Sequence, residues 1–189
     1  YKGVLYGQFM LTETGPRVVE FNARFGDPEA MNTLPMMNTD FLDVLVAARE
    51  DRSLPQLSFQ PKATVCKYAV PDGYPTDPEA GAEVTINPEG VATAVGELTT
   101  KQSRTDQSGA NASDALLYYA SVDDREDGIY TTTSRSYAVV GIGDSIAAAE
   151  EIVEGVLQRA GTEGLRVRHD IGKSDLIQQR IGHMEAIRD

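Results

Sequence analysis

Two stretches rich in β-branched and aromatic residues flank the turn-forming tetrapeptide ETGP near the start of the chain: GVLYGQFMLT at 3–12 and RVVEFNARF at 17–25. Apolar runs separated by such a short turn predict an antiparallel β-hairpin. On a strand, successive side chains alternate between two faces. This alternation predicts a core face and an opposite, largely polar face. The predicted core face holds Val19, Phe21, Ala23 and Phe25, and the opposite face holds Val18, Glu20, Asn22 and Arg24.

The residues after this hairpin predict two short helices. Asp27 is placed to cap the first helix, with Pro28 at its first position and Glu29 beside its positive end. Pro35 interrupts that helix, and Asp40 can cap a second one. The apolar stripe expected on the second helix is Phe41, Leu42, Leu45, Val46 and Ala48.

A proline-containing segment without clear period, residues 51–61, predicts a boundary between two structural units. We therefore expect an α+β protein with one domain at 1–60 and a small mixed α/β domain at 61–189. In the second domain, strands are predicted at 62–70, 82–87, 90–95, 115–122, 128–133 and 136–143, with a turn-rich loop at 71–81. Helices are predicted from Asp144 or Ser145 to Gly161 and at 175–187.

The composition narrows the range of partners. With 29 acidic and 17 basic residues the net charge is −12, which argues against nucleic acid or an anionic membrane as partner. No apolar run approaches the roughly 20 residues of a membrane helix. Cys66 is the only cysteine, which excludes an internal disulfide and fits a reducing cytoplasm. Because the chain opens at Tyr1 directly in a strand pattern, we expect it to be a piece of a longer protein.

The polar side of the hairpin predicts a metal site. Glu20 and Asn22 place two oxygen donors about 7 Å apart along the strand, and Gln8 on the partner strand can add a third if the register allows. Carboxylate and amide oxygens suit Mg²⁺ rather than zinc. Arg24 and the start of the next helix favour a phosphate or acyl phosphate. The alternative is a solvated strand face on which Glu20 and Arg24 pair weakly.

Several motifs resemble one family along almost the whole chain. FNARFGDPE, preceded by GVLYGQFMLT, is similar to the second lobe of the ATP-grasp domain in the phosphoribosylamine–glycine ligase family, also called glycinamide ribonucleotide synthetases. YAVPDGYPTDPEAG, TTTSRSYAVVGIGDSIAAAEE and HDIG resemble the C-terminal domain of that family, in a variant that looks archaeal. The resemblance implies an ATP-grasp lobe at 1–60 and the family's C-terminal domain at 61–189.

The resemblance also implies a reaction and a set of ligands. Family members join glycine to 5-phosphoribosylamine through glycyl phosphate, converting ATP to ADP and phosphate. It implies that Glu20 and Asn22, with Gln8, bind the Mg²⁺ or Mn²⁺ that bridges the ATP phosphates. Arg24 is the expected catalytic residue and, with Asp27, the expected nucleotide contact. Arg135 is a further candidate for holding phosphate or carboxylate groups.

The parts of the family's active site that precede this region do not match anything in the sequence. We therefore expect the chain to need the N-terminal half of the same enzyme as its partner and to be inactive alone. Two alternatives remain open. One is a different ATP-grasp carboxylate–amine ligase, such as a carboxylase-type enzyme, and the other is a non-catalytic interaction domain.

Overall fold

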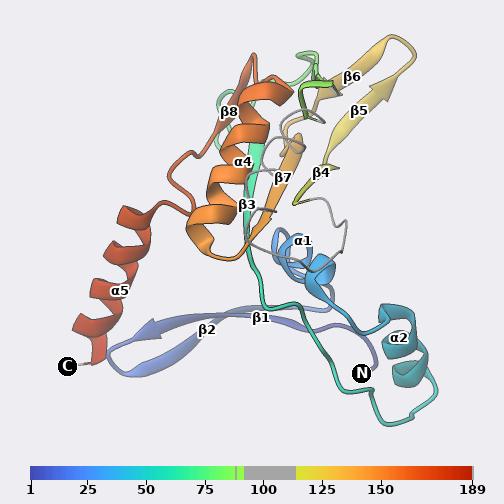
Figure 1. The fold of residues 1–189 in the computed structure, drawn as a ribbon, viewed down its shortest axis with the longest axis vertical. Coiled ribbons are helices and arrows are strands. Elements are labelled where there is room, and N and C mark those ends of the chain that lie inside the picture. Colours follow the sequence, from blue (N-terminus) through green and yellow to red (C-terminus); the bar gives the residue numbers. More distant parts are fainter. Residues whose placement is uncertain (88, 92–113, 189) are drawn as a thin grey trace. The chain divides into compact units, whose positions relative to one another are not determined.

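The computed structural model describes residues 1–87, 89–91 and 114–188, which confirm the predicted α+β class (Figure 1). They form two compact units, Tyr1–Lys62 together with Ser174–Asp189, and Ala63–Lys173. The second unit begins at Ala63, two residues after the predicted start of the second domain at residue 61. The last helix groups with the first unit, so the second unit differs from the predicted domain 61–189 at its C-terminal end.

The first unit opens with the predicted hairpin, formed by β1 (Tyr6–Thr12) and β2 (Gly15–Asn22). The two strands pair in antiparallel register, with Tyr6 opposite Asn22 and Gln8 opposite Glu20. The register then shifts between Gln8 and Phe9. This irregularity leaves Val19 without a residue directly across from it, as in a β-bulge.

The bulge corrects the predicted distribution of side chains. Because Val18 lies opposite Phe9, it shares a face with Phe9 and not with Glu20. The apolar face is also not a core. Phe9 and Phe21 meet edge to face with 5.8 Å between ring centroids, yet they remain 54% and 56% exposed. Within the described residues, the hairpin is a two-stranded sheet of its own.

Two α-helices and a 3₁₀ turn follow the hairpin: α1 (Glu29–Thr33), η1 (Leu34–Met36) and α2 (Phe41–Arg49). Pro35 ends the first helix as predicted. Asp40 caps α2 by accepting a 2.8 Å hydrogen bond from the backbone N–H of Leu42, also as predicted. The predicted cap at Asp27 is wrong, because α1 begins one residue later with Pro28 in the capping position.

The face that α2 buries differs in part from the predicted stripe. Ala47 is the buried residue of this helix, and Phe41 packs on Phe25 with ring centroids 5.7 Å apart. Leu42 and Leu45 are 66% and 43% exposed, so their place in a buried stripe was wrong. The last helix of the unit, α5 (Ser174–Arg188), closely matches the predicted range, and none of its residues is buried.

The second unit is built on a four-stranded antiparallel sheet with the order β4-β7-β3-β8. Its strands are β3 (Ala63–Pro71), β4 (Ala115–Tyr119), β7 (Tyr137–Gly143) and β8 (Leu165–Val167). A separate ribbon pairs β5 (Val122–Arg125) with β6 (Gly128–Thr131). Four strand predictions are thus confirmed, with the range 115–122 divided between β4 and the start of β5.

The predicted strand at 82–87 is wrong, and only Glu83 forms an isolated bridge, with Tyr130. The backbone bonds of this segment go to two different elements. Val84 donates to Ile129 of β6, whereas Asn87 donates to Ala160 at the end of the following helix. A segment that changes partners in this way cannot form a continuous ladder. Most of the predicted strand at 90–95 lies outside the described residues, and residues 90 and 91 are helical.

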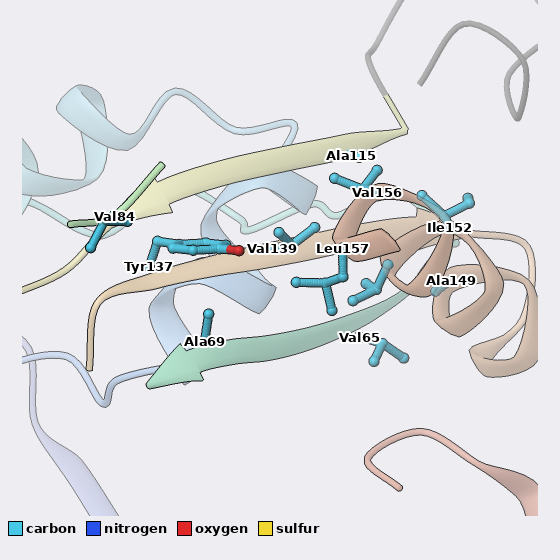
Figure 2. Close-up of a cluster of buried hydrophobic side chains, with 11 residues drawn as sticks. Val65, Ala69, Val84, Ala115, Tyr137, Val139, Ala149, Ile152, Val156 and Leu157 are labelled. Atoms are coloured by element: carbon cyan, nitrogen blue, oxygen red, sulfur yellow. The ribbon is translucent and has the colours of Figure 1, made fainter. Parts of the chain in front are cut away.

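Helix α4 (Ile146–Ala160) covers one face of the sheet and completes the core (Figure 2). Ser145 caps it by accepting a 3.2 Å hydrogen bond from Ala148, and Gly161 ends it with φ of 90°. The cap and the end agree with prediction. The cluster drawn in Figure 2 consists of Val65, Ala69, Val84, Ala115, Tyr137, Val139, Ala149, Ile152, Val153, Val156 and Leu157. None of the described helices is long and apolar enough to span a membrane.

Gly141 lets α4 approach β7 closely, and replacing it should destabilise the second unit. A Cβ at this position would fall on the carbonyl oxygen of Ala149 and within 2.8 Å of the Val153 side chain. We expect Gly141→Ala to cost about 2–3 kcal/mol through overpacking. Hydrogen exchange of β7 amides measures this cost. Gly182→Ala is the control, since a Cβ there meets nothing within 4 Å; equal losses in both variants would contradict the packing argument.

A buried ion cluster also joins β3 to α4. The ammonium group of Lys67, with no exposed surface, lies 2.7 Å from Glu150 and 2.5 Å from Glu154, and donates a 3.0 Å hydrogen bond to the carbonyl of His169. Lys173 pairs with Glu150 at 2.7 Å. The ring of His169 lies 3.0 Å from Glu154. Burial alone would raise the pKa values of Glu150 and Glu154, but hydrogen bonds from Lys173 and Lys67 to Glu150, and from Lys67 and His169 to Glu154, outweigh it and hold both pKa values below their ordinary value.

Candidate metal and nucleotide site

The open end of the hairpin presents polar side chains on one face. Gln8 lies directly opposite Glu20, and Tyr6 lies directly opposite Asn22. Residues that pair across a sheet share a face, and so do residues two apart on a strand. All four side chains therefore belong to the same side of the ribbon. We call this set the polar face of the hairpin.

Glu20 and Asn22 converge on this face. The side-chain amide of Asn22 donates a 2.8 Å hydrogen bond to Oε1 of Glu20. Two hard oxygen-bearing groups are thus held together, and the amide of Gln8 is supplied by the neighbouring strand. No group of three or more His, Cys, Asp or Glu side chains in the described ranges, the polar face included, is arranged to hold a metal ion. The polar face, which relies partly on amide oxygens, is the candidate metal site.

Arg24 follows the polar face directly, but it lies beyond the end of β2 and so does not continue the alternation of the strand. Its guanidinium donates a 2.8 Å hydrogen bond to the carbonyl of Phe25 and is exposed. The positive charge of Arg24 by itself would lower the pKa of Tyr6, but the other groups around Tyr6 raise that pKa by more. Asp27 lies in the same turn as an exposed residue. The five-residue helix α1 gives this turn little support from a helix dipole.

Sequence reasoning missed two members of this region, Tyr6 and Glu29. The hydroxyl of Tyr6 donates a 3.0 Å hydrogen bond to Oε1 of Glu29. That bond, together with partial desolvation and the charges of Glu29 and Glu20, raises the pKa of Tyr6. The position of Tyr6, two residues before Gln8 on the same strand, was the available signal. Glu29 carried no such signal, because it comes close to Tyr6 only through the turn.

Arg135 belongs to the second unit and is a separate candidate. Its guanidinium stacks on the ring of Tyr68, 4.7 Å from the ring centroid. Such stacking fixes the plane of the guanidinium while leaving its edge able to donate hydrogen bonds.

Family comparisons match both parts of the chain. The ATP-grasp (A) domain of phosphoribosylglycinamide synthetase matches residues 1–30, so the hairpin and its turn belong to an ATP-grasp domain. The C domain of phosphoribosylglycinamide synthetase matches residues 64–174, more than half of the chain. The chain therefore belongs to the phosphoribosylglycinamide synthetase family.

Individual relatives agree with this assignment. The chain is 48% identical over its full length to a phosphoribosylamine–glycine ligase of Methanosarcina barkeri and 46% identical to one of Methanococcoides burtonii. In both cases it spans 38% of the length of the relative. A crystal structure of phosphoribosylamine–glycine ligase from Thermotoga maritima shares the fold, with a TM-score of 0.63 at 21% identity over 88% of this chain and 36% of that one.

Proposed function

We propose that the enzyme containing this chain joins glycine to 5-phosphoribosylamine at the expense of ATP, giving glycinamide ribonucleotide, ADP and phosphate. The observation that carries the proposal is the convergence of Glu20 and Asn22, opposite Gln8, within the segment that matches an ATP-grasp domain. Relatives of which the chain spans 38% are named phosphoribosylamine–glycine ligases, which supports the choice of substrates.

The donor set of the polar face fits a hard divalent cation. One carboxylate and two amide side chains offer oxygen ligands of the kind that Mg²⁺ and Mn²⁺ accept, with phosphate and water completing the shell. Glu20, Asn22 and Gln8 would hold the ion. A cation held there would neutralise charge on the phosphate oxygens of ATP.

The remaining roles fall to the turn after β2. Arg24 would hold the transferring phosphoryl group and stabilise the charge that grows on it, and Asp27 would border the nucleotide. In the first step the glycine carboxylate attacks the γ-phosphorus, the bond to ADP breaks, and glycyl phosphate forms. In the second step the amine of phosphoribosylamine attacks the acyl carbon, phosphate leaves, and the nitrogen loses a proton. Arg135 remains a candidate for binding a substrate phosphate or carboxylate.

The proposal is tested by following ADP release in the full-length enzyme. We expect release that requires both glycine and phosphoribosylamine, with glycinamide ribonucleotide as the product detected by mass spectrometry. Release that depends on bicarbonate instead of glycine would support a carboxylase-type ligase. Absence of release with either acid, together with absence of binding of ADP and Mg²⁺ by calorimetry, would support a non-catalytic domain and overturn the proposal.

The 189-residue chain by itself should show no turnover. Its polar face is exposed to solvent on one ribbon, and it spans little more than a third of the relatives it matches. An ATP-grasp reaction requires the nucleotide to be enclosed and water to be excluded. We therefore expect no glycine-dependent ADP release from the purified chain under conditions in which the full-length enzyme turns over. Measurable release that tracks with the purified chain would contradict this expectation.

A further inference from the structure

In the described part of the chain, two tyrosine hydroxyls tie the turn that carries Arg24 to the residues before it: Tyr1 donates a 3.1 Å hydrogen bond to the carbonyl of Ala23, and Tyr6 of β1 bonds to Glu29. Tyr6 projects from β1 opposite Asn22, and its hydroxyl meets Glu29, the first residue of α1, at 3.0 Å. The residues between Asn22 and Glu29 form an irregular turn without strand pairing. The Tyr6–Glu29 bond therefore ties the far end of this turn back to the strand that also bears Gln8.

The turn is shaped around this bond. A Cβ on Gly26 would lie 2.5 Å from Oε2 of Glu29 and 2.8 Å from the ring of Tyr6, so any other residue here would force this pair to shift. Gly26 is buried, and its carbonyl accepts a 3.0 Å hydrogen bond from Ala30. The ring of Tyr6 and the carboxylate of Glu29 therefore both lie against Gly26, in the middle of the turn. Arg24 lies two residues earlier in the same turn, where its guanidinium donates a 2.8 Å hydrogen bond to the carbonyl of Phe25.

We propose that Tyr6 and Glu29 are positioning residues that fix Arg24 beside the metal-binding oxygens of the polar face. The assignment rests on the proposed function, because Arg24 acts there on the transferring phosphoryl group. Neither residue needs to touch the nucleotide. Their contribution is to reduce the number of conformations that Arg24 samples before the transition state, which affects kcat more than ground-state binding.

Kinetics of the full-length enzyme test the positioning role. Tyr6→Phe keeps the ring and removes the hydroxyl, and we expect kcat to fall about tenfold while KM for ATP changes less than twofold, as for loss of a hydrogen bond to a charged group. Glu29→Ala should lower kcat by the same factor as Tyr6→Phe. Glu29→Gln, whose amide oxygen can accept the same hydrogen bond, should retain most activity. Combining Tyr6→Phe with Glu29→Ala should add no further loss. Tyr119→Phe, on an exposed tyrosine of the second unit, is the matched control.

Limited trypsin digestion of the 189-residue chain tests the same contact without any assay of activity. Cleavage after Arg24 should become about tenfold faster in Tyr6→Phe and Glu29→Ala, while cleavage after Arg17, in β2, stays unchanged. Unchanged cleavage after Arg24 would overturn the proposal, and so would a normal kcat in Tyr6→Phe. If the wild-type enzyme shows no glycine-dependent turnover, the proposed function fails and the catalytic role falls with it. The digestion then still decides whether the Tyr6–Glu29 hydrogen bond restricts the motion of the turn at residues 23–28.

Discussion

Replacing Glu20 with alanine is expected to lower kcat of the full-length enzyme by about a hundredfold or more and to abolish tight binding of the metal–nucleotide complex. Glu20 is the only carboxylate among the three proposed metal ligands of the polar face. Its loss leaves two neutral amides, which bind a divalent cation weakly and cannot hold the phosphates in line for transfer. Calorimetry with ADP and Mg²⁺ and paramagnetic resonance of bound Mn²⁺ measure the binding, and ADP release measures the rate.

Glu13→Ala is the matched control for this experiment. Glu13 is an exposed acid in the turn of the same hairpin, away from the polar face, so its removal changes the net charge equally without touching the proposed ligands. We expect Glu13→Ala to bind and turn over like wild type. Glu20→Asp keeps the charge on a shorter side chain. Its metal binding and its kcat should therefore lie between those of Glu20→Ala and Glu13→Ala. Wild-type metal binding in Glu20→Ala would remove Glu20 from the metal site.

Replacing Lys67 with methionine should destabilise the second unit by about 3 kcal/mol. The change leaves Glu150 and Glu154, whose side chains are 9% and 16% exposed, without the cation between them. Removing one partner of a buried ion pair typically costs about 3–5 kcal/mol, and Lys173 and His169 offset part of the loss here. Hydrogen exchange of the β3 and β7 amides measures the change. Lys173→Met, which removes a half-exposed partner of Glu150, should cost less than about 1 kcal/mol.

The cost of Lys67→Met should also depend on pH. In the folded wild type the pKa values of Glu150 and Glu154 lie below their ordinary value of 4.5, so these groups stabilise the fold above that pH and lose this contribution as the pH falls through their folded pKa values. Without Lys67, burial favours the protonated acids instead. The difference between wild type and variant should therefore shrink as the pH falls through 4.5 and through the folded wild-type pKa values below it. A difference that stays constant from pH 7 to pH 3 would show that the cost comes from packing and not from charge.

The local part of the fold could be predicted from the sequence. The hairpin, the Asp40 and Ser145 caps, and the end of α4 at Gly161 follow from signals within a few residues of each element. Lys67 shows where such reasoning stops. It lies in a strand with a clear pattern, but its acidic partners are 83 and 87 residues away, so nothing near it in the sequence indicates that it is buried.

The candidate site was predictable to a similar extent. Glu20 and Asn22 share a face because they are two apart on one strand. Gln8 joins them only because the register shifts between Gln8 and Phe9, since the pairing set by the turn would place Gln8 opposite Val19. The bulge that moves Val18 to the apolar face arises from pairing between strands, which single-strand alternation does not reveal. The Tyr6–Glu29 bond depends on how the turn at 23–28 folds back, and no periodicity describes such a turn.

The division of the chain into units affects the order in which it can fold. The second unit is continuous from Ala63 to Lys173, whereas the first unit combines the beginning of the chain with its last helix. During synthesis the second unit is therefore fully available before α5 leaves the ribosome. Because the first unit is discontinuous, it can be completed only after the second unit has been synthesised.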